Sequence, residues 1–599
     1  MNEKLHAFYE SRQKEFQTQL DEVTRKLNIL AAVRIVIFLI GGIVCFQYYN
    51  TMPYVAYGSL AAAVAIFLVL VKRHDKIKVE KEHLTYLVEV NTEEIGAMMG
   101  DLRPFSNGEV YQQADHPYSF DLDIFGNESI FQNINRTGSY LGGARLAEFL
   151  TEPIYQKERI LLRQQAIAEL KDKVDWRQTF QAHGKKYTED KKAKQQILDW
   201  LDEAPLFAGK QWMKITLIAS PVVAFILIGL ASLDFISANL AFLYCLIQLA
   251  FVGLNTKRIN QQHNQLSQRI KLFKKYAELL KLIEAEDFKS AQLMALKSQL
   301  ESGGKPASVI LNELSSILDR LESRSNAVAA IVFNGLFLRD LRSIIALEEW
   351  KLKYQFEFAN WFDLISDFEA FGSMANYAYN HPNFIFPKIS DKPCHYVAKD
   401  LGHPLLDDFS RVCNDFSIEK AGQISLVTGA NMAGKSTYLR TVGVNLILAM
   451  AGTVVCAKEM EFSPMELYTS MRTNDSLIKH ASFFYAELSK LKTIVDELAG
   501  GKVIFVLLDE ILKGTNSNDQ HTGSEALIEQ IIRNNGSGLI ATHDVSLGVL
   551  QDKYPEQLKN QCFEIEIEDG EMIFDYKVKD GVNQKLNATF LMKQMGITV

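Results

Sequence analysis

Two long apolar blocks interrupt an otherwise charged, helical pattern in the first half of the chain. The first block covers residues 35–71, and its centre, "YYNTMPY", combines tyrosines with the turn-forming Pro53. A block of this length predicts two spans of about 20 residues each, because one buried globular helix does not need so many apolar positions. The second block, within residues 210–254, repeats the pattern around a turn at Leu233 and Asp234. The pattern predicts four membrane spans in two hairpins that contact the lipid bilayer.

Basic residues flank both predicted hairpins. Arg34 precedes the first hairpin and Lys72 follows it, while Lys214 precedes the second and Lys257 follows it. Because basic flanks stay on the cytoplasmic side, this distribution predicts a multi-pass protein of the inner (cytoplasmic) membrane with its C-terminal part in the cytoplasm. The alternative is that the four apolar segments are core helices of a soluble protein.

The second half of the chain changes from long helical patterns to short strands. Apolar β-branched runs at Ile424–Thr428, Val503–Leu508 and Leu539–Ala541 alternate with helical stretches. Such alternation predicts a parallel sheet wrapped by helices. The fold class expected is therefore a C-terminal α/β domain preceded by an all-α helical core that carries two transmembrane helical hairpins.

The chain divides into six predicted segments, since 599 residues exceed what one hydrophobic core supports. They are an N-terminal amphipathic helix at 1–34, a transmembrane hairpin at 35–71, a first part of the helical core at 72–209, a second transmembrane hairpin at 210–254, a helical lever at 255–390, and the α/β domain with a C-terminal dimerisation tail at 391–599.

The amino-acid composition excludes few classes of function. The net charge of -8 does not indicate a nucleic-acid binder, although a local basic patch is compatible with it. The six cysteines are scattered without CxxC spacing, which argues against a disulfide framework and a zinc site.

A phosphate-binding motif follows the first predicted strand of the α/β domain. The stretch "GANMAGKST" fits GxxxxGKS between an apolar strand and a helix that begins near Lys435. Backbone N–H groups of such a loop hold phosphates, the lysine neutralises their charge, and the serine hydroxyl binds Mg²⁺. The predicted nucleotide-binding residues are Gly429, Ala430, Asn431, Met432, Ala433, Gly434, Lys435, Ser436 and Thr437.

Acidic residues and a histidine complete the predicted site. The buried run "VIFVLLDE" ends in Asp509 and Glu510, and "LIATHD" places His543 after the next strand. The aspartate is expected to hold Mg²⁺ together with Ser436, and the glutamate to polarise the attacking water. Lys435, Glu510 and His543 are therefore the predicted catalytic residues of an ATPase that uses ATP and Mg²⁺.

These motifs resemble those of the MutS mismatch-repair family. The stretch "TGANMAGKST" is similar to the family's TGPNMGGKST, and "DEILKGTNSNDQHTG" and "ATHDVSL" follow in the family's order. "RTNDSLIKHASFFYAEL" resembles the segment that holds the family's signature serine, here Ser482. The resemblance implies a homodimer in which Ser482 reaches the partner's γ-phosphate, and it implies DNA as a partner.

The chain also departs from the family's pattern. The first hundred residues offer a polar helix and a membrane hairpin where the family has its mismatch-recognition domain. Arg411 stands where the family has an aromatic residue that stacks on adenine. The sequence therefore does not identify the residue that contacts adenine. The expected protein is a membrane-anchored MutS-like ATPase without that recognition domain.

Three functions are compatible with the sequence. The first is a membrane-anchored ATPase that closes a composite dimer site on MgATP and couples it to DNA, as in mismatch repair or on branched DNA. The second couples the same ATPase to a protein or envelope partner without DNA. The third is a transporter ATPase of the ABC type.

Overall fold

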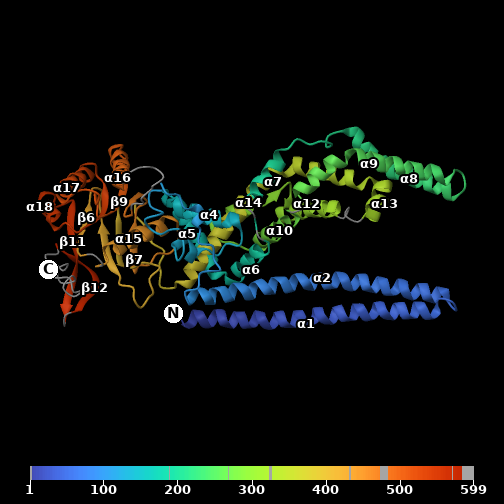
Figure 1. The fold of residues 1–599 in the computed structure, drawn as a ribbon, viewed down its shortest axis with the longest axis horizontal. Helices are drawn as coiled ribbons and strands as arrows, with labels where there is room; N and C mark the ends of the chain where they lie inside the picture. Colours follow the sequence, from blue (N-terminus) through green and yellow to red (C-terminus); the bar gives the residue numbers. More distant parts are fainter. Residues whose placement is uncertain are drawn as a thin grey trace.

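The computed structural model describes residues 3–187, 189, 191–266, 269–322, 327–430, 433–472, 483–568 and 571–582. The molecule is elongated (Figure 1): an α/β domain occupies one end, a helical middle follows, and two helical arms project toward the other end. The expected fold class is confirmed for the helical N-terminal region and the C-terminal α/β domain.

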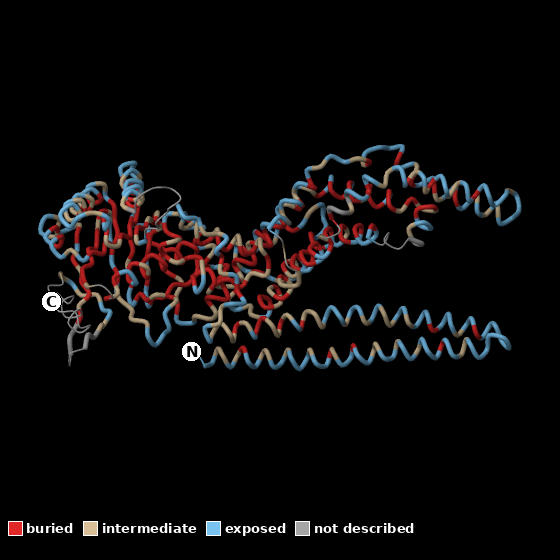
Figure 2. Tube along the Cα trace, viewed as in Figure 1, coloured by how far each residue is buried: buried red, intermediate tan, exposed pale blue. Residues whose placement is uncertain are grey.

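The first arm consists of helices α1 (Glu3–Tyr48) and α2 (Pro53–Met98), which lie antiparallel (Figure 1). Helix α1 continues without a break across residue 34, so the expected amphipathic helix and the first apolar segment form one helix. Pro53 occupies the first turn of α2, where its missing N–H does not cost a helical hydrogen bond. The outer part of this arm is largely exposed (Figure 2).

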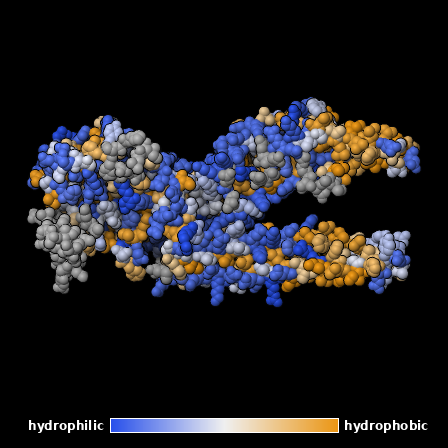
Figure 3. Space-filling view, in the orientation of Figure 1, coloured by the Kyte–Doolittle hydropathy of each residue, from blue (hydrophilic) through white to orange (hydrophobic). Residues whose placement is uncertain are grey.

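The second arm consists of helices α8 (Gln211–Ser232) and α9 (Ala238–Leu266). Its apolar outer end extends toward the same side of the molecule as that of the first arm (Figure 3). Four helices, the two of each arm, are long and apolar enough to cross a membrane, judged by length and composition. In the first arm, only 6% and 11% of the apolar windows are buried, so these side chains lack a protein environment.

Shorter helices form the middle of the molecule around one long helix, α14 (Arg339–Asn380). Its residues are buried along most of its length, with Trp361, Phe368 and Phe371 in the largest hydrophobic core. The surrounding helices are α3 (Ile130–Ile134), α4 (Tyr140–Thr151), α5 (Lys157–Asp172), α6 (Val174–Lys185), α7 (Ala193–Asp202), α10 (Ile270–Ala285), α11 (Ala291–Ser298), α12 (Ala307–Glu322) and α13 (Ala327–Phe337), with a small hairpin of β1 (Glu301–Ser302) and β2 (Lys305–Pro306).

The α/β domain is built on a six-stranded sheet with the order β12-β11-β6-β10-β9-β8. Its strands are β6 (Ile424–Thr428), β8 (Glu466–Ser470), β9 (Ile504–Asp509), β10 (Ser537–Thr542), β11 (Leu558–Glu568) and β12 (Glu571–Asp580), of which only β12 pairs antiparallel among the described strands. The expected strands at 424–428, 503–508 and 539–541 are β6, β9 and β10.

Helices cover both faces of this sheet. Residues along β9 alternate between two cores, with Phe505 and Leu507 facing α15 (Lys435–Met450) and Val506 facing α16 (Phe483–Ala499) and α17 (Ser517–Arg533). A second, four-stranded sheet has the order β3-β7-β4-β5, and its strands are β3 (Lys388–Ile389), β4 (Tyr396–Leu401), β5 (Asn414–Ile418) and β7 (Glu459–Phe462). The short helix α18 (Leu550–Lys553) precedes β11.

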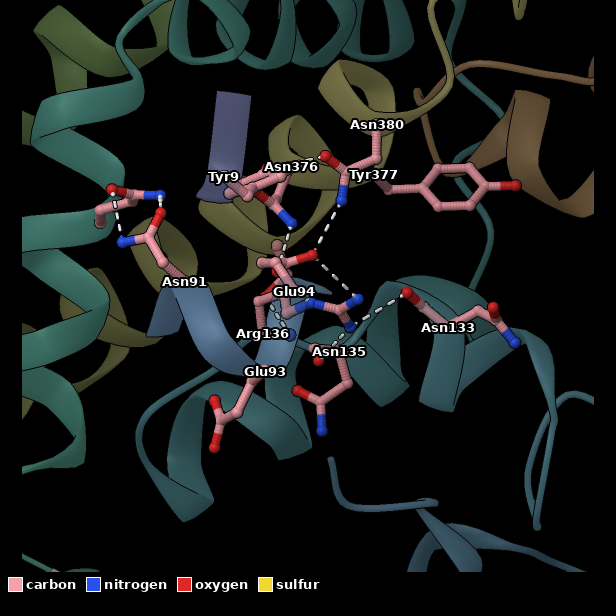
Figure 4. Close-up of polar contacts among 12 residues, drawn as sticks. Tyr9, Asn91, Glu93, Glu94, Asn133, Asn135, Arg136, Asn376, Tyr377 and Asn380 are labelled. Carbon is pink, nitrogen blue, oxygen red and sulfur yellow. Dashed lines mark hydrogen bonds and ion pairs between the residues drawn. The ribbon is translucent and has the colours of Figure 1, made fainter. Parts of the chain in front are cut away.

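A buried polar cluster joins the inner end of the first arm to the inner end of α14. Glu94 of α2 is 2% exposed, and its carboxylate forms an ion pair with Arg136 at 2.5 Å (Figure 4). Asn376 and Asn380 of α14 donate to the two Glu94 oxygens at 2.8 and 2.9 Å, and the Tyr9 hydroxyl of α1 donates to Asn380 at 2.8 Å. We call these five residues the Glu94 cluster.

The Glu94 cluster predicts a matched pair of stability effects. Arg136→Met leaves the Glu94 carboxylate buried without its cation. This change should lower the free energy of unfolding of the chain by about 3–5 kcal/mol. Combining it with Glu94→Gln should restore part of that loss, because the uncompensated charge is then gone. Thermal unfolding of the detergent-solubilised chain measures both effects.

A surface pair serves as the control for this prediction. Lys305→Met removes the exposed ion pair between Lys305 and Glu313, and it should leave the unfolding temperature almost unchanged. An Arg136→Met variant that melts with the wild-type protein would contradict the assigned role of the Glu94 cluster.

Candidate functional site

The predicted phosphate loop connects β6 to α15. Gly429 and Gly434 have φ values of +154° and +104°, and a Cβ on Gly434 would lie 3.1 Å from the Tyr576 ring. Glycine is required at Gly434 because the positive φ and the close ring leave no room for a side chain. Ala433 is buried in this loop, whereas Asn431 and Met432 lie outside the described residues.

Lys435, the first residue of α15, folds back over the phosphate loop. Its Nζ donates to the carbonyl oxygens of Gly429 at 2.6 Å and Ala430 at 2.9 Å. Burial lowers the pKa of Lys435, although the Glu510 and Asp509 carboxylates oppose this effect. The ammonium therefore lies in the loop, where phosphate oxygens could replace the two carbonyl acceptors.

Ser436 and Asp509 meet beside the loop. The Ser436 hydroxyl donates to Asp509 Oδ2 at 2.5 Å, and Asp509 Oδ1 is buried without a hydrogen-bond partner among the described residues. Burial raises the pKa of Asp509, against the Ser436 hydrogen bond. A hydroxyl next to a carboxylate with a spare oxygen is the hard-oxygen donor set that suits Mg²⁺, so these residues fit the expected ion.

Glu510 lies at the same edge of the sheet in a strained conformation, with φ of +48°. Its carboxylate lies 3.0 Å from Lys513 Nζ and 4.0 Å from His543 Nδ1. Burial raises the pKa of Glu510, but the Lys513 hydrogen bond and the nearby cations outweigh it, so the net pKa lies below the ordinary value. The side chain is therefore an ionised carboxylate, as a base requires.

The sheet explains why distant residues converge here. Strands β6, β10 and β9 are adjacent and parallel, so the loops that follow them all emerge at one edge. The Glu510 N–H donates to the Ala541 carbonyl at 2.9 Å, which fixes the β9 loop against the β10 loop. Of the predicted catalytic residues, Lys435 and Glu510 line one cavity, and His543 lies beside Glu510.

The cavity over the phosphate loop has a volume of about 450 Å³. Its wall opposite the loop comes from residues 401–414 and from the β11–β12 pair. The lining residues include Leu401, His403, Leu406, Val412, Asn414, Thr437, Tyr438, Thr441, Phe563 and Tyr576. A cleft of this size with phosphate-binding groups at one end and apolar and aromatic walls at the other is suited to a nucleotide.

Arg411 does not line this cavity. Its guanidinium donates to the Leu406 carbonyl at 3.1 Å, pairs with Asp408 and lies over the Phe384 ring at 5.5 Å from the centroid. These contacts account for the position of the Arg411 side chain outside the cavity lining. Tyr576 of β12 is the partly exposed aromatic residue that does line the cavity.

The signature serine Ser482 lies outside the described residues, which end at Arg472 and resume at Phe483. Both ends of that interval are anchored. Asp121, buried at 2% exposure, accepts the backbone N–H of Arg472 at 3.0 Å and the Thr469 hydroxyl at 2.8 Å. On the other side, Glu487 accepts the Leu512 N–H at 2.5 Å. The helical middle thus contacts the base of the signature segment through Asp121.

Sequence reasoning missed Lys513, His403, Tyr576 and Asp121. Lys513 stands three residues after Glu510, a spacing that could have indicated an ion pair. The other three have no local signal, because Asp121 is about 350 positions from its partners and His403 and Tyr576 reach the cavity only through the tertiary fold.

Comparisons with known proteins match the α/β domain. Residues 425–595 match the family model described as MutS domain V. The DNA mismatch repair protein MutS of Thermotoga neapolitana is 32% identical over 183 residues, which are 30% of this chain and 22% of that protein. The MutS of Clostridium novyi is 30% identical over 281 residues, 45% of this chain and 30% of that protein.

These matches cover only part of this chain and of each relative. The MutS of Thermotoga maritima, 28% identical over 238 residues, is also matched over only 30% of its length. The chain spans less than a third of these relatives, and the matched model covers its α/β domain. The resemblance expected from the phosphate-loop motif is thus confirmed for the α/β domain, which is a MutS-family domain.

Proposed function

We propose that this chain is a membrane-anchored ATPase that binds and hydrolyses MgATP between two copies of its α/β domain and couples this cycle to DNA. The observation that carries the proposal is the convergence of Lys435, Ser436, Asp509 and Glu510 at the mouth of a nucleotide-sized cavity. The proposed division of the chain follows the six segments predicted from the sequence.

The residues of the site have separate roles in hydrolysis. Backbone N–H groups at the start of α15 bind the phosphates, and Lys435 exchanges its two carbonyl acceptors for phosphate oxygens. Ser436 and Asp509 would hold Mg²⁺, which neutralises phosphate charge. Glu510 accepts a proton from the attacking water, with His543 beside it to orient that water. Tyr576 is placed to contact the base or ribose.

Homodimerisation is proposed from the family resemblance. The described chain brings Lys435, Glu510 and His543 together, whereas Ser482 is expected to act on the nucleotide of the partner copy, as the family resemblance implies. Nucleotide binding would then close the dimer. The contact between Asp121 and the start of this segment would pass that closure to the helical middle.

Membrane anchoring is supported by the exposed side chains of both arms. The outer half of α1 exposes Ile35, Phe38 and Ile43 at 54–63%, and α8 exposes Ile215 and Ile218 at 66% and 70%. Contiguous apolar surface on this scale is costly in water. We propose that both arms insert into one bilayer, with the α/β domain on the cytoplasmic side.

The first prediction concerns nucleotide affinity. Lys435→Ala should weaken MgATP binding by about 10- to 100-fold, because a hydrogen bond to a charged group contributes about 1.5–3 kcal/mol. A fluorescent ATP analogue titrated into the detergent-solubilised chain measures the change. Lys420→Ala, which removes an exposed ion pair with Glu556 on the same domain, should bind normally. Equal affinity of the two variants would refute the assigned phosphate loop.

The second prediction concerns the pH dependence of hydrolysis. Because Lys513 holds the pKa of Glu510 below its ordinary value, protonation of Glu510 should reduce the wild-type rate only at a pH below that ordinary value. In Lys513→Met, burial is unopposed by that cation, so the pKa of Glu510 rises and the acid limb of kcat/KM moves to higher pH. Lys492→Met, which removes an exposed helical pair with Asp496, should leave the limb unchanged. An unshifted limb in Lys513→Met would exclude Glu510 as the base.

The third prediction addresses the partner. If the cycle is coupled to DNA, the ATPase rate of the full chain should change with homoduplex, mismatched or branched DNA at one fixed moderate salt concentration, since salt sets non-specific affinity. Lys435→Ala provides the background rate. Turnover that ignores every DNA would mean that the ATPase acts on a protein or envelope partner instead.

A further inference from the structure

Helix α13 is an apolar element that belongs to neither arm. Its sequence, "AVAAIVFNGLF", contains no charged residue, and at about 1.5 Å per residue it is about 16 Å long. That is about half the thickness of a bilayer's hydrocarbon layer, so α13 is too short to span it. An apolar helix of this length is expected either in a protein core or at a membrane boundary.

A core position is excluded by exposure. Ile331, Val332 and Phe333 are 58%, 48% and 41% exposed, which leaves three consecutive large apolar side chains uncovered by the described chain. The C-terminal turn of α13, in contrast, is covered by α9. A Cβ on Gly335 would lie 3.7 Å from the Leu249 side chain and 3.8 Å from the Cys245 side chain, both on α9.

The depth of α13 follows from its contacts with the second arm. Arg342, near the start of α14, donates to the Leu217 carbonyl at 2.6 Å, and about two turns further along α14 Glu349 pairs with Lys214 at 2.5 Å. These charged contacts mark the beginning of the apolar part of α8. Phe337, at the end of α13, contacts Phe225 with ring centroids 5.7 Å apart. Phe225 lies eight residues beyond Leu217, which is about 12 Å deeper along α8.

Contacts at the corner between α13 and α14 fix the orientation of α13 relative to α14. Leu338 adopts a left-handed conformation with φ of +50° and is 1% exposed. The buried Asn334 side chain accepts the Asp340 N–H at 2.9 Å and thereby satisfies an N–H group of the first turn of α14. Arg339 lies over the Phe333 ring, with its guanidinium carbon 4.9 Å from the centroid. The single polar side chain of α13 is thus satisfied within the protein.

We propose that α13 is embedded in the cytoplasmic leaflet beside the second arm, with Ile331, Val332 and Phe333 in contact with lipid acyl chains. The inference rests on the proposed membrane anchoring and adds a third membrane-embedded helix to the second arm. It favours lipid because α13 packs on the apolar arm, with Gly335 against α9 and Phe337 against Phe225 of α8, and because Arg339 and Arg342 supply cations beside it that anionic headgroups attract.

The location has a mechanical consequence. Helix α13 turns directly into α14, and α14 ends at Asn380 in the Glu94 cluster, just before the first strand of the α/β domain. One helix of about 63 Å therefore connects the lipid-embedded corner with the ATPase domain. A movement of the ATPase domain along this helix would reach the leaflet in which α13 lies.

Fluorescence quenching tests the inference on the full chain. Single-cysteine variants are made in a background in which the six native cysteines are replaced, labelled with the environment-sensitive fluorophore NBD, and reconstituted into phosphatidylcholine–phosphatidylglycerol vesicles. The reporter is Val332→Cys, with Ile331→Cys as a second position in case one variant misfolds. Ile226→Cys on α8 reports the span itself, and Val309→Cys, exposed on α12, reports the part outside the membrane.

The expected result separates lipid from water. Val332→Cys should lose emission to nitroxides on the acyl chains, as Ile226→Cys does, because Phe337 of the same helix contacts Phe225 beside Ile226. Val309→Cys should respond not to these nitroxides but to aqueous iodide. If Val332→Cys and Ile331→Cys respond only to iodide, or to no quencher because a second copy or another protein covers them, the inference is overturned while the anchoring stands. If Ile226→Cys is not quenched by lipid, the anchoring itself fails.

Discussion

The removal of apolar surface from water is the constraint on which this structure depends. Both arms expose Ile, Phe, Val and Leu side chains over the length of a membrane span, and both point their apolar ends the same way (Figure 3). A single bilayer can therefore take both arms, whereas no described segment of the chain covers them. The polar length of α2, from Lys72 to Met98, then separates the membrane from the inner end of the arm by about 40 Å.

Helix α14 is in contact with both arms. At its outer end Arg342 and Glu349 hold α8, and in between the buried Glu348 accepts the N–H groups of Leu206, Phe207 and Ala208 just before the second arm begins. At its inner end Asn376 and Asn380 hold the first arm through Glu94. Because a buried charge without its partner is costly, the Glu94 cluster resists separation of the first arm from α14. Helix α14 thus contacts both arms and leads into the α/β domain that carries the nucleotide site.

Local patterns predicted much of this structure. The phosphate loop, the strand before it, the helix after it and the Asp509–Glu510 pair could be read from the sequence, because each depends on neighbouring residues and on strand ends that share one sheet edge. Lys513 also carried a local signal, its three-residue spacing from Glu510. Tyr576 and Asp121 carried none, since they reach the site through contacts that only the fold creates. The contact of Arg411 with Phe384, outside the cavity lining, could not be read from the sequence either. Helix α13 gave no membrane signal because its 11 residues are too few for a span.

Electron microscopy of the full chain in a lipid nanodisc tests the central claim most directly, namely that two arms enter one bilayer and hold a MutS-type ATPase domain away from it. The account predicts that both helical hairpins enter the same disc and that the α/β domain stands at least about 40 Å from its surface, because the polar length of α2 lies between them. A disc that contains only one arm, or an α/β domain lying flat on the lipid, would contradict the account.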